Sequence, residues 1–353
     1  MPRLRRSDCS GPGIRRLRRG RGFTYVDDDA GPVRDAETLD RIRALAIPPA
    51  WKDVWICRDP LGHLQATGID DAGRKQYRYH DQWRTARDRE KFDDMLEFAR
   101  ALPLVRRRVA RDLKADGLGH DQVLACAVRL LDIGFFRIGS EDYAEHNQSY
   151  GLATIRKEHV TIEDDEIVFD YPAKSHKRRV HAIGDEAVRS VIVALKRRRG
   201  GSPELLAFKD GGRWNDVRST HVNAYLKHVA GPTVSAKEFR TWNGTVLAAV
   251  ALATREGSSG SKHARNRTIA AAVKDVAGYL GNTPAIARKS YIDPRVFDRY
   301  LSGWTIAPAL EQAGGPEAMA KTRKRRIIEE AVIDLVGDPP SQLRASPVVA
   351  KAA

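Results

Sequence analysis

The sequence predicts an α+β protein in which a small β-rich N-terminal domain precedes a larger, mainly helical domain. Between residues 23 and 80, apolar and polar side chains alternate around turn signals, as expected for short strands. From about residue 101, apolar residues recur mainly at helical spacing. Alternating runs between residues 158 and 183 interrupt this pattern and predict a short antiparallel sheet of hairpins.

The N-terminal half begins with a basic segment. Residues 1–20 contain seven arginines and one acidic residue, which predicts a disordered arm that either contacts DNA phosphates or only aids solubility. Residues 21–100 predict a first unit, a small sheet with two helices over residues 36–45 and 81–98.

Residues 101–303 predict a second, larger unit, in which helical patterns dominate from residue 185 onward. Polar loops are expected near residues 209–216 and 255–266. The composition of residues 304–353 predicts a basic, Ala/Pro-rich C-terminal tail. A helix is predicted within this tail over 316–336, and the last fifteen residues are expected to be disordered.

Composition limits the partners. The 353 residues carry a formal net charge of +15, which favours a polyanion such as nucleic acid. No apolar run approaches the roughly 18–20 residues that span a bilayer, so no membrane partner is expected and a cytoplasmic, nucleoid-associated protein is predicted. The three cysteines form no CxxC pair, so neither a zinc site nor a disulfide framework is indicated.

Four basic or polar segments suit chemistry on a phosphodiester. Tyr291 ends the run LGNTPAIARKSY, and Arg137, Lys174 and Arg240 lie in basic segments upstream. A free tyrosine has a pKa of about 10, so it needs nearby cations to attack phosphorus at neutral pH. Arginine binds non-bridging oxygens with a planar fork, and lysine can donate a proton to a leaving oxygen.

Taken singly, the cations have simpler explanations. Arg137 could form a structural ion pair with Glu141, four residues on. Lys174 could be an ordinary turn lysine at the tip of a hairpin. Lys237 and Arg240, three residues apart on a predicted helix, could be a surface pair.

The residues of the run that ends at Tyr291 also have simpler explanations. Asn282 and Thr283 stand where a helix N-cap is expected, with Pro284 at the first helical position. A tyrosine at the end of a short helix, such as Tyr291, commonly serves packing. The amide of Asn282 could also donate a hydrogen bond to a phosphate.

Taken in order, these segments resemble the type IB DNA topoisomerases, in particular the small poxvirus and bacterial enzymes. The resemblance covers about residues 22–300 and rests on the motifs LQATGIDDAGRKQYRYH, FFRIGSE, YGLATIRKEHVTI, DEIVFDYPAKS, KEFRTW and VAGYLGNTPAIARKSYI. It implies that residues 21–100 are an N-terminal DNA-binding domain and residues 101–303 a catalytic domain. The two domains would close as a C-shaped clamp around duplex DNA, in a monomer. It also implies relaxation of supercoils through transient cleavage of one strand and a 3′-phosphotyrosyl intermediate. No ATP, metal or other cofactor is expected.

The resemblance assigns roles position by position. Tyr291 corresponds to the attacking tyrosine, Arg137 and Arg240 to the arginines that stabilise the pentacoordinate phosphate, and Lys174 to the general acid. Lys237 corresponds to a second active-site lysine of the viral-type enzymes.

One site position departs from the commoner pattern. Asn282 replaces a histidine found in many relatives, and an asparagine can donate a hydrogen bond but cannot ionise.

DNA contacts are expected on one strand of the N-terminal domain. The positions that match DNA-contacting residues of the viral enzymes are Gln76, Tyr77 and Tyr79. Arg74 and Lys75 precede them, and a basic, aromatic strand of this kind suits a DNA groove.

Two other classes of protein are compatible with parts of this pattern. A tyrosine recombinase uses the same nucleophile, but its second arginine usually follows an HxxR pattern, whereas Lys237 stands three residues before Arg240 here. A non-catalytic DNA-binding protein would also be basic, but it would form no covalent adduct with DNA.

Overall fold

The structure, a computed structural model, describes residues 3–139, 141–174, 177–255, 261–320, 322–337 and 346–347. The chain divides into two compact units, Met1–Asp93 and Asp94–Ala353. The division falls inside helix α2 (Asp81–Asp112), seven residues before the domain boundary predicted at residue 100. The predicted α+β class is confirmed, because the first unit is β-rich and the second is mainly helical.

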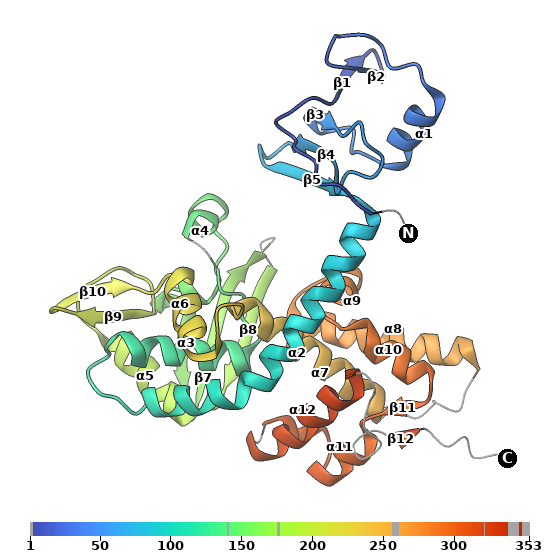
Figure 1. The fold of residues 1–353 in the computed structure, drawn as a ribbon. Coiled ribbons are helices and arrows are strands. Elements are labelled where there is room, and N and C mark those ends of the chain that lie inside the picture. Colours follow the sequence, from blue (N-terminus) through green and yellow to red (C-terminus); the bar gives the residue numbers. More distant parts are fainter. Residues whose placement is uncertain are drawn as a thin grey trace. The chain divides into compact units, whose positions relative to one another are not determined.

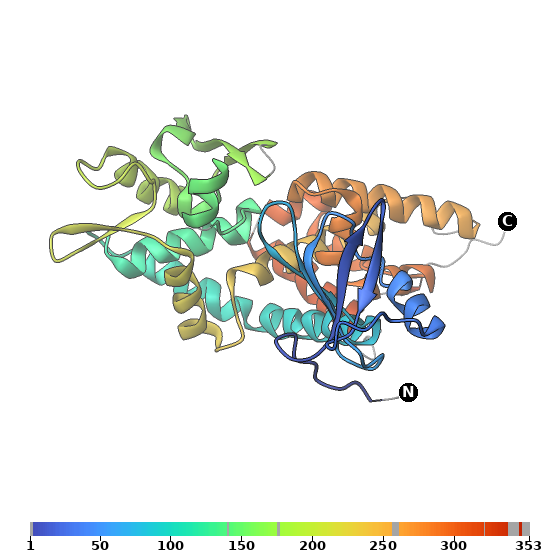
Figure 2. The same ribbon diagram turned by 90° about the horizontal axis from the view of Figure 1, so that it is seen from above.

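The first unit is built on one antiparallel sheet with the strand order β2-β1-β3-β4-β5, drawn in blue in Figure 1 and seen from above in Figure 2. Its strands are β1 (Ile14–Arg19), β2 (Gly22–Val26), β3 (Lys52–Ile56), β4 (Leu64–Ile69) and β5 (Lys75–Tyr79). Helix α1 (Ala36–Ala44) covers one face, where Ile42 packs with Ile14, Val54 and Ile56. β5 is an edge strand, so one side of its backbone has no neighbour within the sheet.

The prediction that residues 1–20 are a disordered arm is wrong for much of the segment that the structure describes. Residues Ile14–Arg19 form β1, which pairs with both β2 and β3. Ile14 is buried in the core, and the backbone N–H of Arg5 donates to the carbonyl of Leu61 at 2.9 Å. The strand was concealed because arginines occupy both of its faces: Arg16, on the same face as Ile14, is partly buried and donates to the carbonyl of Trp51 at 2.6 Å.

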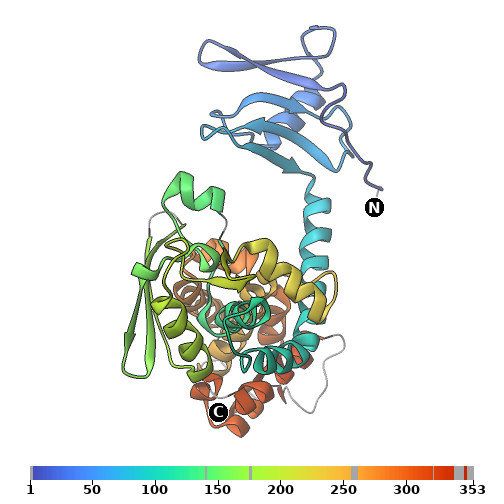
Figure 3. The ribbon, with the colours of Figure 1, turned by 90° about the vertical axis from the view of Figure 1, so that its left-hand side faces the viewer.

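Helix α3 (His120–Gly134) lies at the centre of the second unit, where Figure 3 shows it surrounded by other helices. Nearly all its residues are buried, and it packs against α5, α6 and α7. The other helices of this unit are α4 (Glu141–Asn147), α5 (Glu186–Arg197), α6 (Ser219–Ala230), α7 (Ala236–Thr254), α8 (Lys262–Leu280), α9 (Pro284–Ser290) and α10 (Pro294–Leu301). Single 3₁₀ turns occur at Leu152–Thr154 and Lys157–His159.

The predicted short antiparallel sheet is present and consists of β6 (Val160–Glu163), β7 (Glu166–Ala173) and β8 (Lys177–Ile183). A second hairpin, β9 (Ala207–Asp210) with β10 (Arg213–Asp216), replaces the polar loop predicted near 209–216. Gly211 and Gly212 both have positive φ and make its tight turn, so the polar composition belonged to an exposed hairpin. Of the loop predicted at 255–266, residues 256–260 lie outside the described residues, and α8 begins at Lys262.

The described part of the expected C-terminal tail folds into the second unit. It comprises β11 (Trp304–Thr305), α11 (Ala307–Ala313), a 3₁₀ helix (Pro316–Ala320), α12 (Thr322–Val336) and β12 (Ser346–Pro347). Ile328, Val332 and Leu335 of α12 are buried, so residues 304–337 are not a tail, although the helix predicted at 316–336 exists as α12. Apart from β12, the last fifteen residues lie outside the described residues. Within the described ranges, no helix has both the length and the apolarity to cross a membrane.

Candidate active site

Tyr291 follows α9 directly and is held at its backbone. Its N–H donates to the carbonyl of Ala287 at 3.0 Å, which ends the helix. On the other side its carbonyl approaches α7 so closely that a Cβ added at Gly244 would lie 2.5 Å from the Tyr291 oxygen. Only glycine fits such a contact without displacement, so Gly244 sets the position of the tyrosine.

Arg137 lies in the extended segment that follows α3. Phe135 ends the helix in a left-handed conformation, with φ of 55°. The N–H of Leu152 donates to the carbonyl of Arg137 at 2.7 Å, and a Cβ added at Gly151 would lie 2.5 Å from the Gly139 backbone. This close backbone contact fixes the segment, and the arginine projects from a rigid support.

Arg240, in the second turn of α7, is 5% exposed. Its two terminal nitrogens donate to the carbonyls of Phe135, at 2.5 Å, and Leu280, at 2.8 Å. Its guanidinium carbon lies 5.0 Å from the ring centroid of Tyr291. Burial, and then the charge of Arg137, lower the pKa of Arg240 to about 10, so it remains protonated at neutral pH.

The two arginines act on the tyrosine together. A terminal nitrogen of Arg137 donates to the phenolic oxygen of Tyr291 at 3.4 Å. Burial alone would raise the pKa of the tyrosine, but Arg240 and then Arg137 outweigh it, and the net pKa of Tyr291 is lowered. The site therefore favours the phenolate, which is the nucleophilic form.

Asn282 faces the same arginine. The helix cap of α9 is Thr283, whose side chain accepts from the N–H of Ile286, and Asn282 is free for another role. Arg137 donates to the Oδ1 atom of Asn282. Because a guanidinium can only donate, the amide must present its oxygen to it. The Nδ2 atom of Asn282 is buried and has no hydrogen-bond partner among the described residues.

The two lysines lie at the open side of the site. Lys174 follows β7 and Lys237 lies in the first turn of α7, and both are exposed. They line a pocket of about 450 Å³ together with Arg137, Arg240 and Tyr291. Five site residues predicted from distant parts of the sequence therefore line one pocket. The sixth, Asn282, does not line it but is hydrogen-bonded to Arg137, which does. Ser175 and His176, also in the predicted turn, lie outside the described residues.

Two residues of β8 support the site and were not recognised from the sequence. Arg179 donates to the carbonyls of Gly278, at 3.1 Å, and Tyr279, at 2.6 Å, at the end of α8. It thereby joins the hairpin of Lys174 to the turn that carries Asn282. Burial, and then Arg179, lower the pKa of His181 to about 4, so this histidine is neutral at physiological pH. No local pattern distinguishes such an arginine from its exposed neighbours.

The DNA-contact residues predicted in the first unit are divided between the two faces of β5. Lys75, Tyr77 and Tyr79 are exposed on one face, with the tyrosine rings stacked at 6.1 Å between centroids. Gln76 lies on the other face, where it donates to Asp70 at 2.8 Å, and Arg74 pairs with the same carboxylate. The exposed face is therefore basic and aromatic, whereas Gln76 and Arg74 stabilise the β4–β5 turn.

A second basic and aromatic feature of the first unit was not recognised from the sequence. A hollow of about 700 Å³ is lined by His63, Tyr79 and Trp83, with arginines around them. These are Arg5, Arg6, Arg84 and Arg87. The N-terminal segment contributes two of these cations because it docks beside β4, a contact that composition does not reveal.

No cluster of three or more His, Cys, Asp or Glu side chains suited to a metal ion occurs among the residues that the structure describes. What the second unit does contain is a half-buried tyrosine between two arginines, with two exposed lysines at the pocket mouth. A candidate nucleophile, cations that could bind a tetrahedral or pentacoordinate anion, and candidate proton donors thus lie in one place.

Comparison with known proteins agrees with this arrangement. Residues 80–306 match the family described as "Eukaryotic DNA topoisomerase I, catalytic core", and residues 22–70 match "Bacterial DNA topoisomerase IB, N-terminal domain". The chain belongs to the type IB DNA topoisomerases, enzymes whose general function is the relaxation of DNA. This assignment favours a type IB topoisomerase over the recombinase and the non-catalytic DNA-binding protein considered above.

Named relatives lie among viruses and fungi. The chain is 30% identical over 285 residues to DNA topoisomerase 1B of Acanthamoeba polyphaga mimivirus, covering 79% of this chain and 85% of the relative. It is 25% identical over 293 residues to DNA topoisomerase 1B of vaccinia virus (strain Copenhagen), covering 78% and 87%. A shorter match, 26% over 194 residues, covers 48% of this chain and 19% of DNA topoisomerase 1 of Mycosarcoma maydis.

Proposed function

We propose that this protein relaxes supercoiled duplex DNA by transient cleavage of one strand, with Tyr291 as the nucleophile. The phenolic oxygen attacks phosphorus, the bond from phosphorus to the 5′ oxygen breaks, and a 3′-phosphotyrosyl link forms. The downstream duplex rotates, and the 5′ hydroxyl then attacks phosphorus and releases the tyrosine. The observation that carries this proposal is the contact of the Tyr291 oxygen with Arg137 in a pocket that also contains Arg240.

In this proposal the two arginines bind the non-bridging oxygens of the scissile phosphate. Arg137 and Arg240 both face Tyr291, and both are anchored to rigid backbone. A fixed cation stabilises the charge that develops in the transition state, and each such donor contributes on the order of 3 kcal/mol. The buried Arg240 acts where the effective dielectric constant is low, which strengthens this effect.

Lys174 is the proposed general acid for the 5′ oxygen. It follows β7 directly, is exposed and lines the same pocket as Tyr291, so a phosphate bound there would be within reach of its long side chain. An in-line displacement requires the leaving oxygen to depart on the side opposite the attacking tyrosine. Lys237, at the other edge of the pocket, is the proposed second lysine that assists proton transfer.

Asn282 is the proposed neutral donor to a non-bridging oxygen. Its oxygen is occupied by Arg137, and its buried Nδ2 atom still lacks a partner among the described residues. A buried donor without a partner costs roughly 1–3 kcal/mol, and a bound phosphate oxygen would remove that cost. An asparagine can therefore serve where many relatives carry a histidine, provided the role needs a hydrogen bond and no charge.

We also propose that the reaction uses neither ATP nor a metal ion. The bond that breaks and the bond that forms are both phosphodiesters, so the energy of the DNA backbone is retained in the phosphotyrosine. The cations of the pocket supply the charge that a metal ion would otherwise provide.

In the same proposal the exposed face of β5, with Lys75, Tyr77 and Tyr79, contacts the duplex. All six proposed active-site residues belong to one unit of one chain, which supports action as a monomer. The net charge of +15 supports binding of this kind.

The test is relaxation of a supercoiled plasmid in EDTA, with detergent trapping of the protein–DNA adduct. Wild type is expected to relax the plasmid and to form an adduct at the 3′ end of the nick. Tyr291→Phe is expected to do neither, whereas the control Tyr279→Phe, at an exposed tyrosine, should behave as wild type. Relaxation by Tyr291→Phe would show that another residue is the nucleophile. Activity lost in EDTA and restored by a divalent metal ion would refute metal independence.

A further inference from the structure

The basic run at the start of α12 does not behave as a uniform basic surface. Arg326 pairs with Glu330 on the outside of the helix. Arg325, its neighbour, is 8% exposed and points into the second unit. A buried arginine requires partners for its donors, and those partners indicate its role.

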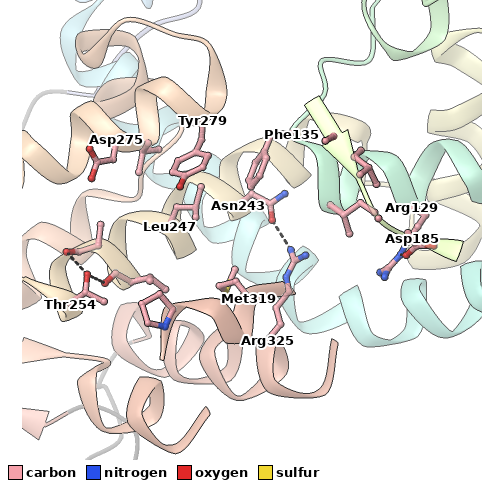
Figure 4. Close-up of a pocket in the computed structure, with 18 of the residues that line it drawn as sticks. Arg129, Phe135, Asp185, Asn243, Leu247, Thr254, Asp275, Tyr279, Met319 and Arg325 are labelled. Carbon is pink, nitrogen blue, oxygen red and sulfur yellow. Dashed lines mark hydrogen bonds and ion pairs between the residues drawn. The ribbon is translucent and has the colours of Figure 1, made fainter. Parts of the chain in front are cut away.

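Arg325 joins two elements of the active site. Its Nη2 atom donates to the carbonyl oxygen of Asp132 at 3.3 Å, to the carboxylate of Asp132 at 3.2 Å and to the Oδ1 atom of Asn243 at 2.9 Å. Asn243 in turn donates from Nδ2 to the same Asp132 carbonyl at 3.1 Å. Figure 4 shows the side chain of Arg325 directed at Asn243, on the wall of a pocket of about 670 Å³.

Both partners lie close to the arginines that flank Tyr291. Asn243 follows Arg240 by three residues on α7, which is about one helical turn. Asp132 lies in the last turn of α3, three residues before Phe135, whose carbonyl accepts from Arg240. The contact among Arg325, Asp132 and Asn243 therefore joins the end of α3 to α7 directly behind the point where Arg137 and Arg240 emerge.

The contact among Arg325, Asp132 and Asn243 is part of a buried network of ion pairs. Burial would raise the pKa of Asp132, but Arg325 and then Arg106 outweigh it, and the carboxylate stays ionised. Arg106 binds Asp132 through two hydrogen bonds of 2.8 Å and also pairs with Glu329, which accepts from Arg325 at 2.9 Å. Removal of one partner from such a buried network leaves charges without compensation, so the network tolerates few alternative arrangements.

We propose that Arg325 is a positioning residue for strand cleavage, which acts by fixing Arg137 and Arg240 relative to each other. The inference rests on the proposed function. Arg325 also lies beyond residues 80–306, the stretch that matches the topoisomerase I catalytic core. In this chain, α12 is therefore part of the support of the active site rather than a basic appendage that binds DNA.

The experiment is single-turnover cleavage at saturating DNA by the full chain, using a duplex whose short 5′-hydroxyl fragment dissociates after cleavage. Arg325→Met keeps most of the side-chain volume and removes the hydrogen bonds, and Arg326→Met is the matched control on the outer face. We expect Arg325→Met to lower the cleavage rate by about 10- to 100-fold, as for a displaced catalytic group, with DNA affinity within about threefold of wild type. Arg326→Met should leave the rate unchanged.

A double-mutant cycle separates positioning from a loss of folded protein. If Arg325 acts through Arg240, then Arg325→Met should cost little further rate, less than about threefold, in an Arg240→Ala background. If the two losses multiply fully, the positioning role is refuted. Thermal unfolding checks the folded fraction, and if Arg325→Met does not fold, Arg325→Lys is used in its place. The lysine keeps the charge, but one nitrogen cannot replace both Nη2, which contacts Asp132 and Asn243, and Nε, which contacts Glu329, so an intermediate loss is expected.

The outcomes also separate this inference from the proposed function. Wild type that forms no covalent adduct would refute the nucleophilic role of Tyr291, and the positioning role would be refuted with it. Wild type that cleaves, together with folded Arg325 variants that cleave equally fast, would refute the positioning role alone. Reduced DNA affinity with an unchanged rate at saturation would assign Arg325 to DNA binding and would equally refute it.

Discussion

The phenolic oxygen of Tyr291 accepts a hydrogen bond from Arg137 at 3.4 Å. With Arg240 beneath the ring, this contact lowers the pKa of the tyrosine in spite of its burial. In the proposed reaction, the same cation would both favour ionisation of the tyrosine and stabilise the negative charge of the phosphate.

The first prediction concerns the pH dependence of cleavage. A cation stabilises the phenolate, so its removal raises the pKa of Tyr291. Arg137→Met should shift the rise of single-turnover cleavage rate toward higher pH and lower the rate at pH 7.5 by about 100-fold. Arg288→Met, on α9 but stacked on Phe297, is the control and should leave the profile in place. A slow variant with an unshifted profile would mean that Arg137 does not influence ionisation of the tyrosine.

The second prediction concerns the proton given to the leaving oxygen. Lys174→Ala should cleave DNA about 100-fold or more slowly, in the range of general acid catalysis. A substrate with sulfur at the 5′ bridging position should restore the rate, because a thiolate leaves without a proton. Lys177→Ala, on the same hairpin, should show neither the loss nor the rescue. A Lys174→Ala enzyme that is equally slow on both substrates would contradict the general-acid role.

The third prediction concerns Asn282. Asn282→Asp would pair with Arg137 and place a negative charge beside the phosphate, so it should reduce cleavage more than Asn282→Ala does. Asn282→His retains a donor and should remain within about tenfold of wild type. Cleavage and religation rates measured on the same duplex provide the comparison. An aspartate variant more active than the alanine variant would show that Asn282 does not face the phosphate.

The fourth prediction concerns the backbone contact behind the tyrosine. A methyl group at Gly244 would lie 2.5 Å from the carbonyl oxygen of Tyr291. Gly244→Ala should therefore lower the free energy of unfolding by about 1–3 kcal/mol and reduce cleavage at saturating DNA. Gly278→Ala, where the added methyl group meets nothing within 4 Å, should instead stabilise α8 by up to about 1 kcal/mol. Equal stability and activity of the two variants would show that α7 yields easily at this contact.

The fifth prediction concerns the exposed face of β5. Lys75→Ala should lower the salt dependence of DNA binding by about one unit of the logarithmic slope. Tyr77→Ala should weaken binding through lost contact area, whereas Tyr77→Phe should bind as wild type if the ring rather than the hydroxyl makes the contact. Arg43→Ala, which removes a cation paired with Asp40 on α1, should leave the slope unchanged. Unchanged binding in all three β5 variants would exclude this face from the interface.

Much of the fold was predictable because the spacing of apolar residues along a helix or strand shows which of its faces is buried. The three strands between Val160 and Ile183 alternate apolar and polar residues, and they were found where predicted. Ile14 was missed because arginines surround it, and hydrophobic periodicity is weak when the exposed face carries long charged side chains. The β9–β10 hairpin was missed because each strand has only four residues, and three of the four in β10 are polar.

The order of the motifs was enough to identify the residues proposed for the site, but it could not predict the contacts between them. Gly244 and Tyr291 are 47 residues apart, and nothing in either segment indicates that their backbones touch. Arg325 and Arg326 are adjacent and chemically identical, yet one is buried and the other exposed. Helix phase decides which of them turns inward, and that phase depends on what α12 packs against.

The attachment of Tyr291 has a mechanical consequence. Its carbonyl rests on Gly244, and two residues later the N–H of Asp293 donates to the hydroxyl of Thr245 at 3.1 Å. In the proposed covalent state, a rotating DNA molecule pulls on the phenolic oxygen. Tension along the strand then passes directly into a nineteen-residue helix, α7, rather than into a compliant loop. The 5′ hydroxyl thus returns after each rotation to a phosphorus atom that has kept its place, which favours resealing over loss of the broken end.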